Sequence, residues 1–157
     1  MDKQKITAIG KPFDIHERLL LFACDIVRAA QFLHNRGAIG RALSYQILAA
    51  GTSVGSNSEE ADGASSHRDF IAKQRIALKE AKEVRFRLRV CRRTELLDEQ
   101  FDPLVQESDE LVRILGKIVH VAARRERVFS SGAAVSLALV TFGSLYLALN
   151  IALSIVH

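Results

Sequence analysis

The sequence predicts an all-α protein: an antiparallel up-down-up-down four-helix bundle followed by a C-terminal hydrophobic helix. Three observations predict this fold. Apolar residues recur alternately three and four positions apart in four successive segments, which is the spacing of a helix that faces a bundle core. The connections, at about residues 36–38, 62–65 and 94–101, are short enough that consecutive helices must lie side by side. No segment alternates apolar and polar residues, so the chain offers no strand.

The first helix is expected to run from about Phe13 to Asn35. Asp14 stands at its start, where a carboxylate side chain accepts hydrogen bonds from unpaired backbone N–H groups. Gly37 follows its last turn, where a glycine lets the chain leave a helix at positive φ. The apolar positions form one stripe along this helix: Ile15, Leu19, Phe22, Ile26, Ala29 and Leu33.

The second helix has a stripe of mainly small residues and is expected to end at Asp62-Gly63, a turn dipeptide. Gly51 and Gly55 lie four positions apart on a neighbouring face. Each glycine inside a helix costs about 1 kcal/mol relative to alanine, so we expect close packing against a neighbouring backbone to offset the loss. The stripe consists of Leu43, Ile47, Ala50, Val54, Asn57 and Ala61.

The third and fourth helices begin with recognisable start signals. Ser66 followed by Asp69 has the spacing of a capping box. Asp102 followed by Pro103 is typical of an N-cap and a first helical position. The stripe of the third helix is Phe70, Gln74, Ala77, Ala81, Val84, Leu88 and Cys91. The stripe of the fourth helix is Leu104, Ser108, Leu111, Leu115, Ile118 and Ala122.

Three regions follow from the distribution of charge: a polar N-terminal segment at residues 1–12, the bundle at residues 13–127 and a hydrophobic C-terminal helix at residues 128–157. Every formally charged side chain lies at or before Arg127. The uncharged run that follows exceeds the roughly 20 residues that a helix needs to cross a bilayer. We therefore expect a membrane anchor, and a helix buried within an oligomer is the alternative.

Charge and cysteine usage indicate a cytoplasmic bundle. Lys and Arg number 22 against 18 Asp and Glu, a net charge of +4, which is weaker than that of tails that coat nucleic acid. Cys24 and Cys91 form no CxxC pair, and the N-terminus resembles no secretory signal. By the positive-inside rule, the cations nearest the hydrophobic run also place the bundle in the cytoplasm. These cations are Lys117, Arg124, Arg125 and Arg127.

No catalytic, cofactor-binding or metal-binding motif is recognisable. Di-metal bundles use Glu-x-x-His on facing helices, and neither that spacing nor HExxH occurs. Ser53 has no histidine and aspartate arranged nearby in the sequence to activate it. We therefore expect a protein that is not an enzyme and that binds no cofactor.

A polar network is predicted between the second and third helices. Asn57 occupies a position in the apolar stripe and Glu60 lies one turn on, so both are expected to face the third helix. Lys73 and Lys79 are the cations that would balance Glu60, because a buried carboxylate without a partner is costly. A ligand or partner site at Asn57 and Glu60 is the alternative.

The third helix carries a row of cations on a side away from its apolar stripe. Residues 73–93 hold nine Lys and Arg against two Glu, and such an excess can neutralise phosphates. Three interpretations remain open: contact with nucleic acid, contact with a protein partner, and a solvated or inter-subunit face. The row consists of Arg75, Lys79, Lys82, Arg85, Arg89, Arg92 and Arg93.

Several motifs of the second and third helices keep a fixed order: GTSVGSN at residues 51–57, Glu-Ala at 60–61, DFIAK at 69–73 and LKE at 78–80. This pattern resembles the 23S rRNA-intervening-sequence family of four-helix bundle proteins. Two features differ from the family. Its aromatic-Trp-Leu triplet is Phe86-Arg87-Leu88 here, and the hydrophobic tail is not part of its usual domain.

The resemblance implies a small bundle with no assigned enzymatic activity that assembles as a ring-shaped homo-oligomer, a pentamer in relatives. It also implies contact with RNA, DNA or a reverse-transcriptase-like protein, since some relatives accompany the reverse transcriptases of diversity-generating retroelements. Together with the residue patterns, it predicts a non-catalytic, self-associating binding or scaffold module that is anchored to the membrane. The alternative is a soluble nucleic-acid-binding accessory protein of the retroelement type that uses the basic face of the third helix.

Overall fold

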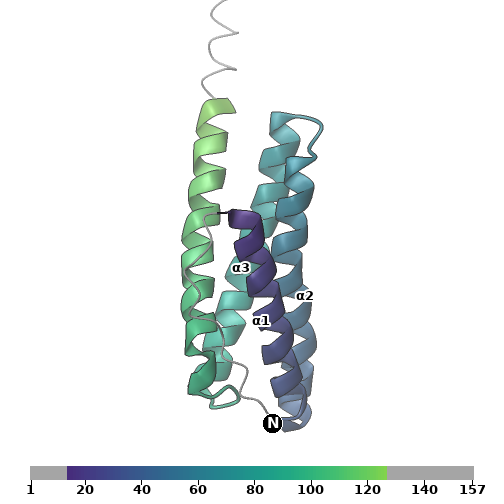
Figure 1. Cartoon of the computed structure of the whole chain (residues 1–157), viewed down its shortest axis with the longest axis vertical. Helices are drawn as coiled ribbons and strands as arrows, with labels where there is room; N and C mark the ends of the chain where they lie inside the picture. Colours follow the sequence, from purple (N-terminus) through teal and green to yellow (C-terminus); the bar gives the residue numbers. More distant parts are fainter. Residues whose placement is uncertain (1–13, 127–157) are drawn as a thin grey trace, which may run out of the picture. The chain divides into compact units, whose positions relative to one another are not determined.

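A computed structural model describes residues 14–126 of the chain, and this part is helical (Figure 1). Three helices follow one another: α1 (Ile15–His34), α2 (Gly37–Asp62) and α3 (His67–Arg93). A short 3-10 turn, η1 (Glu99–Phe101), then leads into a fourth helix, which occupies residues 102–126. No residue between 14 and 126 belongs to a strand, so the predicted all-α class with four helices is confirmed for this part of the chain.

Consecutive helices lie side by side and antiparallel. α1 packs along α2, and α2 packs along α3. The start of α1 meets the end of α2, where His16 Nε2 and Asp62 Oδ2 lie 2.8 Å apart. The end of α1 meets the turn before the fourth helix, where the ring centroids of Phe32 and Phe101 are 5.1 Å apart. The helices therefore alternate in direction in the order that the short connections predict.

One apolar core joins the four helices. Leu19, Val54, Leu88 and Leu115 come from one helix each, are at most 1% exposed and belong to a single cluster. Full burial of a leucine or valine side chain contributes roughly 1.5–3 kcal/mol relative to its exposure. The packing of these apolar stripes against one another is therefore what holds the bundle together.

The buried face of α2 differs from the prediction by one residue at two places. Ser44 and Ser58 are buried, whereas Leu43 and Asn57, which the stripe predicted, are only partly buried. Helices approach most closely where the side chains between them are small. α2 therefore turns its serine and glycine side inward, and the larger neighbours lie at the edge of the core.

The glycines of α2 have different surroundings. A Cβ atom added at Gly51 would lie 2.5 Å from Cγ2 of Ile26, whereas one added at Gly55 would meet nothing closer than Leu19 at 3.9 Å. The structure thus places the predicted close packing at Gly51 and not at Gly55. The contact lies within one bundle, between α2 and a side chain of α1.

The predicted start signals of α1 and α3 are present. Asp14 Oδ1 accepts a hydrogen bond from the backbone N of His16 at 3.0 Å. Ser66 Oγ accepts one from the backbone N of Asp69 at 3.1 Å. Gly37 has the predicted positive φ, +79°, but it is already the first residue of α2. The connection between α1 and α2 is therefore tighter than expected.

Asp102 is not the N-cap that the sequence predicts. Its φ and ψ, −56° and −40°, are helical, and the chain turns earlier, in η1. Asp98 caps that turn by accepting a hydrogen bond from the backbone N of Gln100 at 3.3 Å. The prediction was wrong because η1 leads the chain directly into the helix, so the backbone is already helical at Asp102. Its carboxylate instead bonds to Arg92 of α3, a contact that sequence spacing does not reveal.

The bundle occupies nearly all of the residues that the structure describes. Residues 14–120 belong to one compact unit, which holds α1, α2, α3 and most of the fourth helix. Within residues 14–126 no helix has the length and apolar character needed to span a membrane. The predicted membrane anchor, residues 128–157, and the polar segment, residues 1–12, lie outside the described residues.

Candidate nucleic-acid interface on α3

The seven predicted cations of α3 fall into two groups. One group pairs with acidic residues of the fourth helix and consists of Arg85, Arg89 and Arg92. The other group makes no ion pair with another helix within residues 14–126 and consists of Arg75, Lys79, Lys82 and Arg93. The second group is therefore the one whose charge is least neutralised by the rest of the described bundle.

Asp109 of the fourth helix holds two arginines of α3. An Nη2 atom of Arg89 lies 2.9 Å from Oδ1 of Asp109, and Nη1 of Arg85 lies 3.7 Å from the same oxygen. These pairs join two helices and are partly shielded from solvent. We therefore infer that Arg85 and Arg89 stabilise the bundle by joining α3 to the fourth helix.

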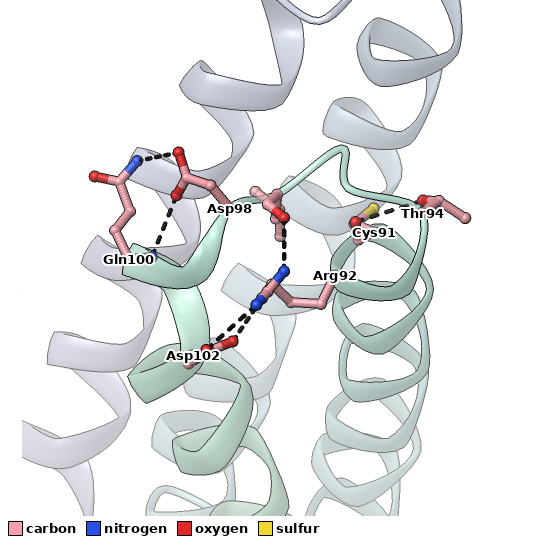
Figure 2. A network of polar contacts seen from close by, with 7 residues as sticks. Cys91, Arg92, Thr94, Asp98, Gln100 and Asp102 are labelled. Atoms are coloured by element: carbon pink, nitrogen blue, oxygen red, sulfur yellow. Dashed lines mark hydrogen bonds and ion pairs between the residues drawn. The ribbon is translucent and has the colours of Figure 1, made fainter.

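Arg92 anchors the connection between α3 and the fourth helix (Figure 2). Its Nε and Nη2 atoms donate to the two carboxylate oxygens of Asp102 at 2.5 and 3.3 Å, and its Nη1 donates to the backbone O of Leu97 at 3.2 Å. The hydrogen bond between the two side chains raises the pKa of Arg92 and lowers the pKa of Asp102. Both groups are therefore charged at neutral pH, and their bidentate geometry orients the connection.

The remaining cations project from the side of α3 that faces away from the core. Arg75, Lys82 and Arg93 are exposed and have no carboxylate partner within the described residues. Lys79 has only Glu80 beside it, with 3.8 Å between the charged atoms, and its side chain is 74% exposed. Exposed pairs of that kind are weak, so Lys79 remains available to a ligand.

Two further residues complete this surface, and the interpretation of charge alone missed them. Phe86 is 67% exposed, and Arg68 is exposed one heptad before Arg75. Residues seven apart on a helix lie on the same side, and a search for heptad spacing in both directions would have found them. We call the resulting surface the α3 outer face: Arg68, Arg75, Lys79, Lys82, Phe86 and Arg93.

Of the predicted polar network, the structure brings together only one pair. Lys73 Nζ lies 3.1 Å from Oε2 of Glu60, which joins α3 to α2. Asn57 Nδ2 instead donates to the backbone O of Ser53 in its own helix at 2.8 Å. Lys79 lies on the outer face beside Glu80.

The buried polar contact between α2 and α3 involves a pair that the sequence did not predict. Gln74 Nε2 donates to Ser58 Oγ at 3.3 Å, and both residues are at most 3% exposed. Gln74 Oε1 has no hydrogen-bond partner among the described residues. The pair is a structural feature of the core, and the ligand or partner site considered at Asn57 and Glu60 stays a prediction.

A cluster of ion pairs, formed by Arg18, Glu107 and Glu110, joins α1 to the fourth helix. Arg18 donates to Glu107 at 2.5 and 3.0 Å and to Glu110 at 2.7 Å, and its side chain is only 13% exposed. The hydrogen bond with Glu107 is the main reason that the pKa of Arg18 is raised. The partners are about ninety positions apart in the chain, which is why no sequence spacing points to them.

Within residues 14–126 no group of three or more His, Cys, Asp or Glu side chains is placed to hold a metal ion. Both cysteines are free thiols, exposed at Cys24 and buried at Cys91. Burial raises the pKa of the Cys91 thiol, so it is less ionised than a free thiol at neutral pH. The absence of enzymatic activity and of a cofactor stays a prediction.

Residues 11–117 match the family described as 23S rRNA-intervening sequence protein. The chain belongs to this family. The match covers the region that contains α1, α2, α3 and most of the fourth helix, and it confirms the family that the GTSVGSN, DFIAK and LKE motifs indicate.

The chain is also similar to a solved structure. It is a crystal structure of a protein of unknown function from the S23 ribosomal protein family of Bacteroides thetaiotaomicron, with 38% sequence identity and a TM-score of 0.62. The similarity covers 98% of that chain and 68% of this one. No curated protein matches the chain.

Proposed function

We propose that this 23S rRNA-intervening sequence protein is a non-catalytic, self-associating binding module whose α3 outer face contacts nucleic acid. The observation that supports the ligand class is a set of exposed cations that form no ion pair with another helix within residues 14–126. Five exposed Lys and Arg side chains share this face, namely Arg68, Arg75, Lys79, Lys82 and Arg93.

The charge of this face fits a phosphate backbone. Each cation that neutralises a phosphate releases a condensed counterion, so binding is favourable and falls steeply with added salt. Residues 68–93 extend along about 38 Å of helix at 1.5 Å per residue, which is long enough to follow several phosphates of one strand. In an oligomer, repetition of the face would strengthen the field that attracts the ligand.

The experiment is nucleic-acid binding by fluorescence anisotropy over a series of salt concentrations. Arg75→Glu with Lys82→Glu should weaken binding by about tenfold or more and should lower the salt dependence. Arg113→Glu with Lys117→Glu is the matched control, because both residues are exposed cations of the fourth helix. If the intact protein binds neither RNA nor DNA at low salt, the α3 outer face is a solvated or protein-contacting surface instead.

Self-association is supported by large apolar side chains that remain exposed on α1 and α2. Leu20 and Val27 are 58% and 38% exposed on one side of α1, and Tyr45 is 61% exposed on α2. Leu20 and Val27 are seven positions apart and so lie on the same side of α1, and contiguous exposed apolar surface is typical of protein contact sites. We propose that copies of this chain cover them, in the ring-shaped pentamer that the family resemblance implies.

The oligomeric state tests this part of the proposal. Light scattering coupled to size-exclusion chromatography should give a defined oligomer for the intact protein. Leu20→Glu with Val27→Glu should shift it to the monomer, because each new carboxylate would have to be buried without a partner. Glu17→Lys changes an exposed residue of the same helix and should leave the oligomer unchanged. A monomer in the unmodified protein contradicts self-association.

Membrane anchoring remains a proposal that the sequence of residues 128–157 supports. That run holds no formally charged residue and is long enough for a bilayer span. Membrane fractionation of the full chain and of a chain ending at residue 127 tests it. Recovery of the full chain in the soluble fraction would favour the alternative, a soluble accessory protein of the retroelement type with a reverse-transcriptase-like partner.

A further inference from the structure

Phe86 lies among the exposed cations of the α3 outer face. On its N-terminal side, Lys82 and Lys79 are four and seven residues away, and Arg93 is seven residues away on its C-terminal side. These spacings put the ring and the three cations on one side of the helix. The phenyl ring is 67% exposed, so the helix presents an aromatic surface inside a row of positive charges.

Within residues 14–126 the ring of Phe86 makes no contact with another aromatic ring and lies under no cation. The rings of Phe32, Phe70 and Phe101 each contact another aromatic ring, and Phe32 also lies under the guanidinium of Arg36 at 5.1 Å. No such contact involves Phe86 within residues 14–126, and it does not belong to the core cluster. A single exposed apolar residue is ordinary on a protein surface; its position between exposed cations is what distinguishes Phe86.

We propose that Phe86 is a stacking platform for an unpaired base, so that the α3 outer face selects single-stranded over double-stranded nucleic acid. Cations that follow the backbone combined with an aromatic side chain that stacks on a base are the two parts of single-strand recognition. In a duplex the faces of the bases are already stacked on one another, and the ring has no base to contact. This inference rests on the proposed nucleic-acid function and names the form of its ligand.

The first test compares single-stranded and duplex probes on the full chain. The probes are fluorescein-labelled 20-mers of thymidine and of uridine and a blunt 20-base-pair DNA duplex. Phe86→Leu should weaken the binding of both single strands by about 5- to 100-fold and should leave the duplex affinity unchanged. Phe86→Leu keeps an apolar side chain at an exposed position, so the bundle should fold as before.

Matched variants separate stacking from charge. Ile39→Ala removes an apolar side chain that is also largely exposed, 70%, but lies on α2, and it should change neither affinity. Arg75→Glu with Lys82→Glu should weaken single strands and duplex alike. If the charge reversal weakens binding and Phe86→Leu does not, the nucleic-acid function stands and the stacking inference is wrong. If no probe binds at low salt, the proposed function itself fails.

A second test uses fluorescence. The sequence contains no tryptophan, so Phe86→Trp introduces a single reporter on the α3 outer face. The single-stranded 20-mers should quench its emission and the duplex should leave it unchanged, because only an unpaired base can stack on the indole. Equal quenching by duplex and single strand would overturn the inference, as would unchanged emission on saturation with the single strand.

Discussion

Gly51 of α2 lies against Ile26 of α1 with no space for a side chain between them. A Cβ atom at residue 51 would stand 2.5 Å from Cγ2 and 2.7 Å from Cγ1 of Ile26. Ile26 is fully buried, and its β-branched side chain has little rotameric freedom inside a helix. α1 and α2 can therefore approach this closely only because glycine carries a hydrogen atom where other residues carry Cβ.

Gly51→Ala should lower the free energy of unfolding by about 1–3 kcal/mol, because overpacking costs more than the helix propensity that alanine adds. Gly55→Ala is the matched control in the same helix, where a Cβ would meet nothing within 3.9 Å, and it should raise stability by about 0.5–1 kcal/mol. Urea unfolding followed by circular dichroism measures both. Stabilisation by both variants would contradict the packing described at Gly51.

Arg18→Met should cost about 2 kcal/mol, because Glu107 and Glu110 would lose the cation that joins them to α1 in a largely buried place. Arg28→Met is the control. Arg28 is half exposed and pairs with Asp25 of its own helix, so its loss should cost less than about 0.5 kcal/mol. Chemical unfolding compares the two variants. Equal losses of unfolding free energy would mean that the contacts of Arg18 with Glu107 and Glu110 contribute no more than a surface ion pair.

The pair formed by Asp102 and Arg92 should make stability depend on pH in the acid range. Because the hydrogen bond to Arg92 lowers the pKa of Asp102 in the folded state, the folded protein binds fewer protons there than the unfolded chain. The stabilisation that this ion pair contributes is present above the pKa of about 3.9 that Asp102 has in the unfolded chain. This stabilisation is lost as the pH falls through the lower pKa that Asp102 has in the folded protein.

The comparison is between the intact protein and Asp102→Asn over a pH series. The difference in their free energies of unfolding should be constant near neutral pH and should shrink below about pH 4. Asp25→Asn, in a pair whose partners lie in one helix, serves as the reference. If the difference in free energy of unfolding instead grew on acidification, a lowered pKa of Asp102 in the folded state could not explain it.

Ser58 and Gln74 should be coupled across the core. Ser58→Ala alone removes the partner of the Gln74 amide and should cost about 1–3 kcal/mol, since a buried donor is left unsatisfied. Ser58→Ala with Gln74→Leu removes both polar groups and should be close to neutral or stabilising. A double-mutant cycle measures the coupling, and simple additivity of the two changes would argue against a direct hydrogen bond.

The surface of α3 illustrates what sequence reasoning could and could not resolve. Helical spacing predicted seven cations away from the apolar stripe, and none of the seven is buried. It could not distinguish Arg89, which pairs with Asp109, from Lys82, which pairs with nothing in the described residues. An ion pair between two helices depends on how the helices are rotated against each other, and that information is absent from a single helix's pattern.

Polar positions within the core show the same limit. The alternation of three and four residues identified Leu19, Val54, Leu88 and Leu115 as core residues, and all four are buried. For α2 the same rule selected Asn57, whereas Ser58 is the buried residue. When most of a helix is made of small residues, the hydrophobic pattern is too shallow to define which side faces inward.

The sequence by itself determined the four helices, their order and most of the core, because helical periodicity and short connections are local properties of the chain. Tertiary structure alone decided which glycine is packed against Ile26 and which cations are neutralised by the fourth helix. Those outcomes depend on distances of a few ångströms between side chains far apart in sequence. They arise only when all four apolar stripes are buried together.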